Sequence, residues 1–543
     1  MMYCEHMEKQ VVLKKRVTDH GEVYTGKRVV YAMLDLVKQE TERIESRFLE
    51  PSCVTGNFLT EILERKLRVV ESRYSKSQLD YERNTVLAVS SIYGIDILED
   101  NVVECRKRLF DIFDQRYTGL FKELAKDECR NAVSYILERN IIWGDTLTLK
   151  TVGATPQPIV FSEWFPVNGS MLKRRDFTFH GLLDHEAIKE LPFFSDLGGD
   201  MFITTPMKPE EIFNMKFDVI IGNPPYQLKD GGFGRSASPI YQNFVHQAKK
   251  LKPRFLTMII PSRWFAGGKG LNDFRKEMLN DDRIRKIVDF EDASECFPCV
   301  DIAGGICYFL WERDSTGQCE VVTMHNNTEA VSIRKLNEFK TFIRHGQAVP
   351  IIRKVLAKKE KIMSDHVSAR KPFGLRTVVR PQKSGDLKLR WQKGEGPYNS
   401  KDLTTGVEMI DKWKVITSYV GNDHAGNPDK DGKRRVFSKI DILPPGTICT
   451  ETYLVIGSYN VKAHAMNLVG YMKTRFFRFL VAQFMCSQYI AKNSYAFVPV
   501  LDMSTSWTDE TLYKRYGFTK DEISFIESKI RPFDSILLSG NPK

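Results

Sequence analysis

Four consecutive residues combine a rigid backbone, hydrogen-bond acceptors and an aromatic ring: Asn223, Pro224, Pro225 and Tyr226. The two prolines fix φ twice and remove two backbone donors, so the turn that they form is rigid. Such a turn would present the Asn223 side-chain carbonyl and the Pro224 main-chain carbonyl to the two N–H donors of a planar amino group. Holding both donors draws the nitrogen toward sp3 geometry and frees its lone pair to attack, while Tyr226 offers a flat face on which a base can stack.

The segments around this turn alternate between strand-like and helix-like patterns. Residues 217–221 form a strand-like run that leads through Gly222 into the turn, an order that a plain Pro-Pro turn does not require. Other strand-like runs lie at residues 47–49, within 87–97, at 141–144 and at 256–260, and helix-like runs at 29–40, 57–67 and 101–113. This alternation predicts an α/β fold with a doubly wound, parallel, Rossmann-like sheet. Ligands of such sheets bind at the carboxyl ends of the strands, where the Asn223 turn is expected.

A β-hairpin interrupts the alternation. Asn168-Gly169 separates two β-like runs, residues 158–165 and 171–179, and Asn-Gly is the strongest short hairpin signal. We therefore expect an insertion in the α/β domain at about residues 151–211.

The pattern changes again after residue 313. Residues 316–330 are polar and irregular, residues 447–458 are apolar and β-rich, and residues 462–490 have the pattern of one long helix. A chain of 543 residues is also too long for one ordinary core. We predict one domain over residues 1–325 and a second, α+β domain over residues 326–543.

The composition favours a polyanionic partner. The formal net charge is +11, and residues 353–393 hold thirteen basic side chains against three acidic ones; positive patches attract nucleic acid or other polyanions. The ten cysteines have no regular spacing, which is typical of free thiols rather than a disulfide framework. No run is long and apolar enough to cross a membrane, and the first residues lack the apolar core of a signal peptide, so we expect a cytoplasmic protein.

With Asn223-Pro-Pro-Tyr226 after a strand, residues from about 20 to 312 resemble the gamma-class N6-adenine DNA methyltransferases of restriction–modification systems. In that family Asn or Asp opens the motif, whereas the cytosine-N4 enzymes usually have Ser, so Asn223 favours adenine. The resemblance implies that S-adenosyl-L-methionine is the cofactor and double-stranded DNA the substrate. It also implies that the target adenine is flipped out of the helix and attacks the methyl group directly.

A turn between the first strand and its helix resembles the family's first cofactor motif. The turn begins with Glu50 and has Val54 where the family more commonly has glycine. Backbone N–H groups at such a turn would lie near the cofactor's carboxylate, and Glu50 would face its ammonium. The resemblance assigns cofactor contacts to Glu50, Ser52, Cys53, Gly56, Asn57 and Phe58.

Two further acids close strand-like runs. Asp96 is expected by resemblance to accept both ribose hydroxyls, as an acid does in dinucleotide folds, with Ile97 packed on the cofactor's adenine. Asp145, followed by Thr146, matches the acid that accepts from the adenine amino group. The alternatives are a surface acid at a strand end for Asp96 and a turn or helix cap for Asp145.

The remaining motifs concern the methionine end and the target base. Tyr24 and Thr25 would line the methionine end of the cofactor, although Thr25 is also an ordinary candidate for a helix cap. Phe297 resembles the family's second stacking residue and would sandwich the extruded adenine with Tyr226, unless it is a core phenylalanine. The reaction needs no metal, because the methyl group is already activated on a sulfonium, and the histidines form no HExxH pattern.

The second domain occupies the position of the target recognition domain in gamma-class enzymes. The insertion at residues 151–211 is too small to be that domain, as it would have to be in the alpha class, although its hairpin is also basic. Arginine reads guanine edges, and both arginine and lysine bind phosphate. We expect DNA contacts from Lys173, Arg174, Arg376, Arg380, Arg390 and Trp391, each of which is as consistent with a solvated basic face.

Other functions remain open at this stage. The Asn223 motif serves any planar amine or amide, so methylation of RNA or of a protein glutamine is an alternative, and an inactive DNA-binding subunit is another. No PD…(D/E)xK arrangement has the spacing of a fused nuclease. A restriction endonuclease encoded elsewhere remains a candidate partner.

Overall fold

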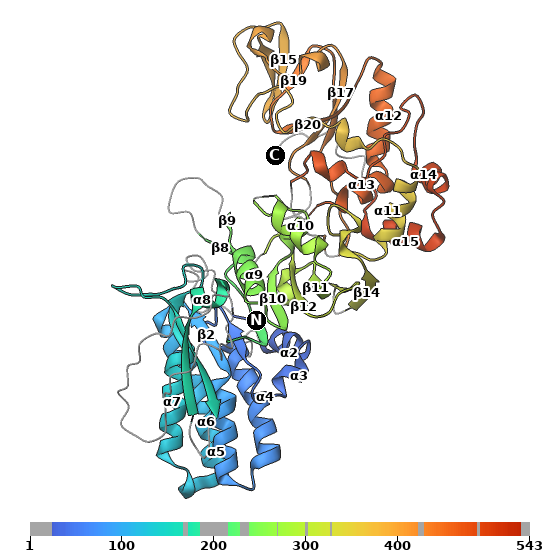
Figure 1. Cartoon of the computed structure of the whole chain (residues 1–543). Helices are drawn as coiled ribbons and strands as arrows, with labels where there is room; N and C mark the ends of the chain where they lie inside the picture. Colours follow the sequence, from blue (N-terminus) through green and yellow to red (C-terminus); the bar gives the residue numbers. More distant parts are fainter. Residues whose placement is uncertain are drawn as a thin grey trace, which may run out of the picture.

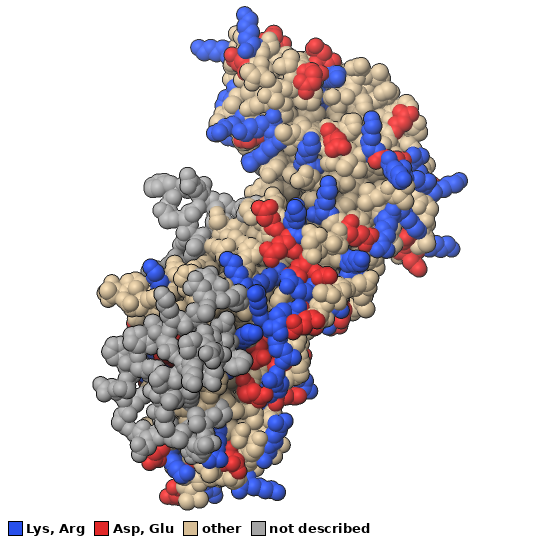
Figure 2. All heavy atoms as spheres, viewed as in Figure 1, with Lys and Arg blue, Asp and Glu red and all other residues tan. Residues whose placement is uncertain are grey.

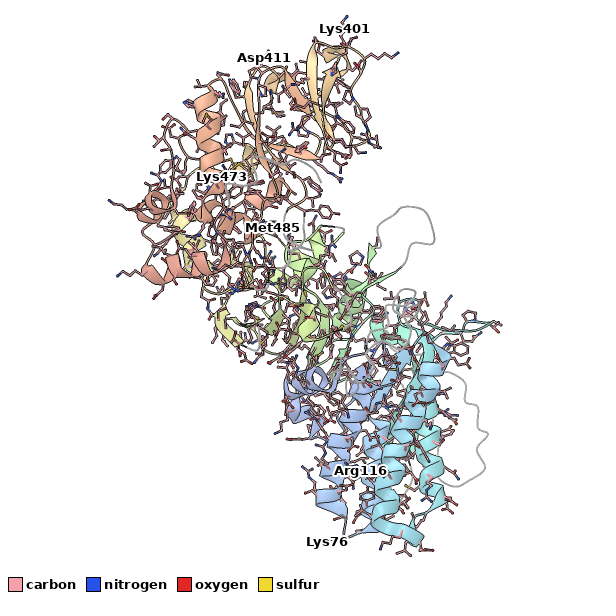
Figure 3. The ribbon with its side chains drawn as sticks, turned by 180° about the vertical axis from the view of Figure 1, so that it is seen from behind. Lys76, Arg116, Lys401, Asp411, Lys473 and Met485 are labelled. Carbon is pink, nitrogen blue, oxygen red and sulfur yellow. The ribbon has the colours of Figure 1, made fainter. Side chains whose placement is uncertain are left out.

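Two lobes make up an elongated molecule (Figure 1). A computed structural model of the chain describes residues 24–166, 172–184, 215–228, 238–268, 270–298, 302–325, 328–421, 428–429, 431–485 and 489–533. Lys76 and Arg116 mark the far end of the first lobe, Lys401 and Asp411 mark that of the C-terminal lobe (residues 348–533), and Met485 lies between these ends (Figure 3). In the ranges just given, no helix has the length and apolarity needed to cross a bilayer.

A ten-stranded mixed sheet forms the centre of the first lobe, in the order β14-β13-β11-β12-β10-β7-β1-β2-β3-β4. The strands are β1 (Phe48–Glu50), β2 (Ile92–Asp96), β3 (Ile141–Asp145), β4 (Lys150–Thr151), β7 (Val219–Gly222), β10 (Phe255–Pro261), β11 (Ile284–Phe290), β12 (Ile306–Glu312), β13 (Cys319–His325) and β14 (Thr328–Arg334). From β10 to β3 all neighbours are parallel, which confirms the predicted parallel centre. Beyond it β12 is antiparallel to both β10 and β11, so the sheet as a whole is mixed.

Successive side chains of each central strand enter opposite cores. Phe48 faces one core and Leu49 the other, as the two-residue period of a strand requires. The first core contains α2 (Lys27–Asp35), α4 (Asn57–Tyr74), α5 (Gln78–Ser90), α6 (Glu99–Phe121) and α7 (Asp127–Asn140). The second contains α8 (Phe179–Asp184), α9 (Tyr241–Lys250), α10 (Asn272–Asn280) and one side of the hairpin of β5 (Val160–Pro166) and β6 (Leu172–Thr178). Short elements complete the lobe: α3 (Lys38–Thr41), β8 (Gln227–Leu228) and β9 (Ser238–Pro239).

The predicted hairpin is confirmed, because β5 and β6 pair antiparallel in register from Val160↔Thr178 to Pro166↔Leu172. Its Asn168-Gly169 turn lies outside the described residues, as does the rest of the predicted insertion from 185 to 211.

Two sequence predictions about local structure are wrong. Residues 316–330, expected to be irregular, contribute β13 and the start of β14, and the sheet therefore continues past residue 325 to Arg334. The single long helix expected at 462–490 is instead α12 (Lys462–Lys473) and α13 (Arg475–Ala482). Thr474 separates them with extended backbone and caps α13 by accepting a hydrogen bond from Phe477 N, an N-cap role that threonine favours.

The C-terminal lobe is α+β. Its two small sheets have the orders β16-β15-β19 and β18-β17-β20, and its largest core lies between the second sheet and the helices. The elements are α11 (Ala348–Ala357), β15 (Leu387–Trp391), β16 (Gly394–Tyr398), β17 (Trp413–Ser418), β18 (Ile440–Leu443), β19 (Thr447–Cys449), β20 (Tyr453–Tyr459), α12, α13, α14 (Asp509–Tyr516) and α15 (Lys520–Lys529).

A buried charge cluster joins the lobes. Glu291, directly after β11, lies 3.2 Å from His345 Nε2, 3.6 Å from an Arg434 guanidinium nitrogen and 3.8 Å from one of Arg344. Burial alone would raise the pKa of Glu291, but His345 and the two arginines hold it well below its usual value. Because Arg434 belongs to the C-terminal lobe, Glu291 ties that lobe to the end of a sheet strand.

Lys66 gives the first lobe a pH-dependent stability. Its ammonium, buried under the start of β1, donates to the carbonyls of Ile44 and Ser46 and to the Ser91 hydroxyl, yet burial lowers its pKa to about 7. Between pH 7 and the unfolded pKa near 10.5, the unfolded chain holds a proton that the folded chain lacks, so folding stability rises with pH. We expect the unfolding free energy of the wild type relative to Lys66→Met to increase by up to about 1.4 kcal/mol per pH unit over this window. Denaturant titrations of both proteins at several pH values measure this; a constant difference would contradict it.

Candidate active site

The turn after β1 is strained and held in place by an acid. Val54 has φ 47° and Gly56 φ 82°, both in the left-handed region, which is unfavourable for a β-branched side chain. Asp96, at the end of β2, compensates by accepting a 2.9 Å hydrogen bond from Val54 N, and Cys53 N donates to Ile95 O at 2.9 Å. The unusual valine noted in the sequence therefore occupies the turn conformation that a glycine would adopt without strain.

The turn forms one wall of a small hollow. The hollow is lined by Tyr24, Thr25, Glu50, Ser52, Cys53, Val54, Asn57, Phe58 and Asn223. Seven of these residues were predicted as cofactor contacts and Asn223 as the residue that activates the nucleophile, and the structure brings them together. Gly56 shapes the turn without lining the hollow: a side chain there would strike Cys105 Sγ, which is 2.6 Å from the position of an added Cβ.

Glu50 makes this hollow suitable for a cation. Its carboxylate is buried, and Oε2 has no hydrogen-bond partner among the residues described. Burial raises the pKa of Glu50 well above its usual value, and Cys105 and Asp96 add to the effect. The α-ammonium of an amino-acid-like ligand would supply the missing partner, so these residues fit the methionine end of S-adenosyl-L-methionine.

The other predicted cofactor residues lie at the carboxyl ends of β2 and β3, which are adjacent and parallel. Besides Val54 N, Asp96 accepts from Leu98 N at 2.9 Å and from Asn101 Nδ2 at 3.1 Å. Ile97 is 45% exposed, as expected of a residue that would pack on a ligand.

At the end of β3, Asp145 accepts from Leu147 N at 2.9 Å, and the Thr146 hydroxyl donates to Pro51 O. These contacts fix the loops at the strand ends, and the first turn with them. Asp145 therefore has the turn-capping contact that the sequence left as an alternative, and a contact to the cofactor's adenine stays a prediction.

The Asn223 turn follows β7 directly. Asn223 Nδ2 donates to Thr25 Oγ1 at 3.2 Å, Pro224 is buried and Pro225 partly so. Tyr226 packs against both cores of the first lobe. Burial, followed by the nearby Cys296 and Cys307, raises the pKa of its hydroxyl well above the usual value. Rigid backbone, amide and aromatic ring thus meet at the edge of the hollow.

Phe297 has no accessible ring face. It is 0% exposed and belongs to the core that also contains Ala293, Cys296 and Ile306. A base could stack on it only after this core opened. The structure thus places Phe297 in the core position that the sequence left as the alternative, and we assign it no stacking role.

The residues expected to contact DNA differ in their exposure and in their partners within the protein. Arg376 and Arg380 are exposed, and Arg380 stacks on Trp391 with its guanidinium carbon 4.5 Å from the ring centroid. Arg390 instead forms ion pairs with Glu395 at 2.7 Å and Asp441 at 3.0 Å.

In the hairpin, Arg174 donates to the Tyr135 hydroxyl at 2.6 Å and pairs with Asp176 at 3.2 Å. The side chain of Lys173 lies outside the described part of the chain. Arg174 and Arg390 thus already have partners within the protein, and DNA contacts by these two residues and by Lys173, Arg376, Arg380 and Trp391 stay proposals.

Asp96 yields the second testable prediction, on cofactor affinity. Asp96→Ala removes the acceptor that holds the strained Val54 turn, together with any bond to the ribose. Because hydrogen bonds to a charged group contribute about 1.5–3 kcal/mol each, we expect S-adenosyl-L-methionine to bind at least about tenfold more weakly. Calorimetry with S-adenosyl-L-methionine measures this affinity. Unchanged affinity of Asp96→Ala would remove Asp96 from the site.

The matched part of the chain runs from β2 through the Asn223 turn to Phe297. Residues 90–297 match the model of the Eco57I restriction-modification methylase family. A 161-residue stretch is 35% identical to a protein of Mycoplasma pneumoniae described as an uncharacterized adenine-specific methylase, covering 28% of this chain and 38% of the relative. Over 135 residues the chain is 33% identical to the Type II methyltransferase M.PstI of Providencia stuartii, covering 23% and 26%. The matches thus span less than half of either relative.

Solved structures of restriction-modification enzymes are also similar to this chain at low identity. The Type IIL enzyme MmeI in complex with DNA has a TM-score of 0.44 at 10% identity, covering 89% of this chain and 69% of that one. The Type ISP enzyme LlaGI in complex with a DNA substrate mimic has a TM-score of 0.42 at 10% identity, covering 88% and 46%. These scores are too low to transfer the role of any residue.

Proposed function

We propose that the protein is a site-specific DNA methyltransferase that transfers a methyl group from S-adenosyl-L-methionine to the N6 amino group of adenine, in a restriction–modification or an orphan defence system. The observation that carries the proposal is the shared hollow, in which the buried Glu50 carboxylate and the Asn223 amide line the same space. The family match over residues 90–297 supports adenine methylation of restriction-modification type.

The cofactor would be held by its charged end. Glu50 would accept from the ammonium, and the backbone N–H groups of the turn from Ser52 to Asn57 would face the carboxylate. Ile97 and the acids Asp96 and Asp145 would hold the nucleoside end. When bound, S-adenosyl-L-methionine supplies a methyl group that is already electrophilic, so the protein has only to position the nucleophile.

The nucleophile would be prepared by the Asn223 turn. The Asn223 side-chain carbonyl and the Pro224 carbonyl would accept the two N–H donors of the adenine amino group, which becomes more positive as it attacks. Preorganised acceptors at a site of developing positive charge stabilise the transition state more than the ground state. Tyr226 would stack on the adenine, which must leave the duplex to reach the hollow.

The C-terminal lobe is our candidate for reading the DNA target. It contains the whole basic stretch of residues 353–393, with exposed Arg376 and Arg380, and the Arg380 guanidinium packs on the Trp391 ring. Arginine is well suited to both phosphate and guanine. Figure 2 shows that basic side chains also extend over the junction of the lobes, interspersed with acids rather than forming one continuous patch. A duplex held by both lobes would be consistent with this distribution.

A transfer assay tests the proposed function. The full chain is incubated with methyl-labelled S-adenosyl-L-methionine and, separately, with unmethylated duplex DNA, RNA and a protein mixture, with Asn223→Ala as the inactive control. We expect label in DNA, recovered as N6-methyladenine on nucleoside analysis. Label in RNA, in protein glutamine or in cytosine would replace the substrate that we propose, and no label in any of them would favour an inactive DNA-binding subunit.

A further inference from the structure

We propose that Thr25 is a positioning residue that sets which end of the Asn223 amide faces the nucleophile. The inference rests on the proposed function, because it concerns how the same hollow activates the amine. An amide side chain carries an acceptor oxygen and a donor NH2 group of nearly the same shape. If Asn223 turned by 180°, its NH2 group would meet the N–H donors of the substrate, and activation would be lost.

The contact with Thr25 favours one of these two orientations. Asn223 Nδ2 donates to Thr25 Oγ1 at 3.2 Å, so the amide oxygen is directed away from Thr25. Both residues line the hollow proposed for the cofactor's charged end, and Thr25 is only 4% exposed.

A hydroxyl has one proton, and in this arrangement that proton is available to another acceptor in the hollow. A carboxylate of the bound cofactor that accepted this proton would leave Thr25 Oγ1 able only to accept from Asn223. The Asn223 amide would then have a single favoured orientation.

A second set of bonds holds Thr25 itself. Arg108 donates through Nη1 to Asn57 Oδ1 at 2.9 Å and to Thr55 O at 2.6 Å. A guanidinium has no acceptor, so this bond fixes the Asn57 amide with its oxygen toward Arg108. Asn57 Nδ2 then donates to Thr25 O at 3.1 Å. The path from α6 through Arg108, Asn57 and Thr25 ends at Asn223, and each amide along it has one defined orientation.

The decisive test is a double-mutant cycle that combines Thr25→Val with Asn223→Asp, because an aspartate at position 223 has no amide whose orientation must be set. A carboxylate presents an oxygen whichever way it turns, and the family resemblance implies that Asp is accepted at position 223. Thr25→Val removes the hydroxyl. At saturating cofactor its single-turnover transfer should be about tenfold slower than that of the wild type, the effect of one hydrogen bond of ordinary strength. In the Asn223→Asp background the same change should alter the rate less than about twofold, since no orientation remains to be set.

The cycle separates positioning from cofactor binding. If Thr25 served only the cofactor, the rate at saturating cofactor would be unchanged, or would change by the same factor, in both backgrounds, and the inference would be wrong. Calorimetry with S-adenosyl-homocysteine, the reaction product, should show the same loss of affinity for Thr25→Val in both backgrounds, which also confirms that each variant is folded.

Thr25→Ser gives an independent arm. Serine keeps the hydroxyl and should retain at least about half of the wild-type rate, as expected where the hydrogen bond rather than the methyl group matters. If Asn223→Asp proves inactive, the comparison of Thr25→Val with Thr25→Ser tests the inference without it. Equal rates for these two variants would contradict the inference.

Failure of the proposed function would be recognised separately. The cycle is measured on whichever of DNA, RNA or protein the wild type methylates, so the cycle can still be interpreted if the substrate is not DNA. An active Asn223→Ala variant would overturn activation at Asn223, and the role of Thr25 with it. Activity that depends on Asn223 but is indifferent to Thr25 would overturn this inference alone.

Discussion

Replacing Asn223 with alanine should slow methyl transfer by about 100- to 1000-fold, the usual cost of removing one preorganised group that acts in the transition state. Asn223 lies in a turn after β7 with its side chain partly exposed, so little of either core depends on it. Cofactor affinity should therefore stay nearly unchanged. The loss should concentrate in the chemical step, where the amine nitrogen acquires positive charge.

The measurement is single-turnover transfer with saturating cofactor and DNA, which separates chemistry from binding and product release. Tyr226→Phe is a useful companion because it keeps the ring and should be mild, whereas Tyr226→Ala should also raise the Michaelis constant for DNA. An Asn223→Ala protein that retains more than about a tenth of the wild-type rate would remove the central element of the mechanism, given the usual size of such effects.

The second large effect concerns stability at the junction of the lobes. Glu291→Ala removes the carboxylate that lies 3.6 Å from Arg434 and 3.2 Å from His345, while Arg344 keeps Asp289 at 2.6 Å. Arg434 would then be a buried cation without its acid. Breaking a buried ion pair from one side costs about 3–5 kcal/mol.

Denaturant unfolding followed by fluorescence measures the change, provided that the two lobes unfold together. Two separate transitions in Glu291→Ala, against one in the wild type, would support the same role more directly. Glu320→Ala, which removes a partly exposed ion pair 3.0 Å from Lys286, is a matched control and should cost less than about 1 kcal/mol. A comparable loss in both variants would contradict a special role for Glu291.

The sequence predicts the centre of the fold well because strong patterns coincide there. The segments leading into Glu50, Asp96 and Asn223 are short apolar runs followed by polar turns, and each became a central parallel strand. The edge of the sheet was missed for a physical reason: β14 alternates exposed and partly buried residues, as an edge strand with a solvated face does, and such a run reads as polar and irregular.

The sequence predicts which residues line the site but not the hydrogen bonds that they form with one another. A turn motif identifies Glu50 and Asn57, yet it does not reveal that Val54 is strained or that Asp96 relieves it. Phe297 shows that the sequence can also leave a residue's location open, since an aromatic residue in an apolar context has the same pattern in a core and at a binding face. Whether Arg390 is available for DNA likewise depends on Asp441, which lies 51 positions away along the chain.

The junction around Glu291 also limits where a chimera of the two lobes can be joined. Two of its three partners, Arg344 and His345, precede α11 and so travel with the first lobe, and only Arg434 comes from within the C-terminal lobe. A chimera joined after His345 would retain most of the cluster but would need a basic residue at the place of Arg434 in the incoming lobe. A recombination point upstream of Arg344 would replace all three partners at once and leave Glu291 to face a foreign surface.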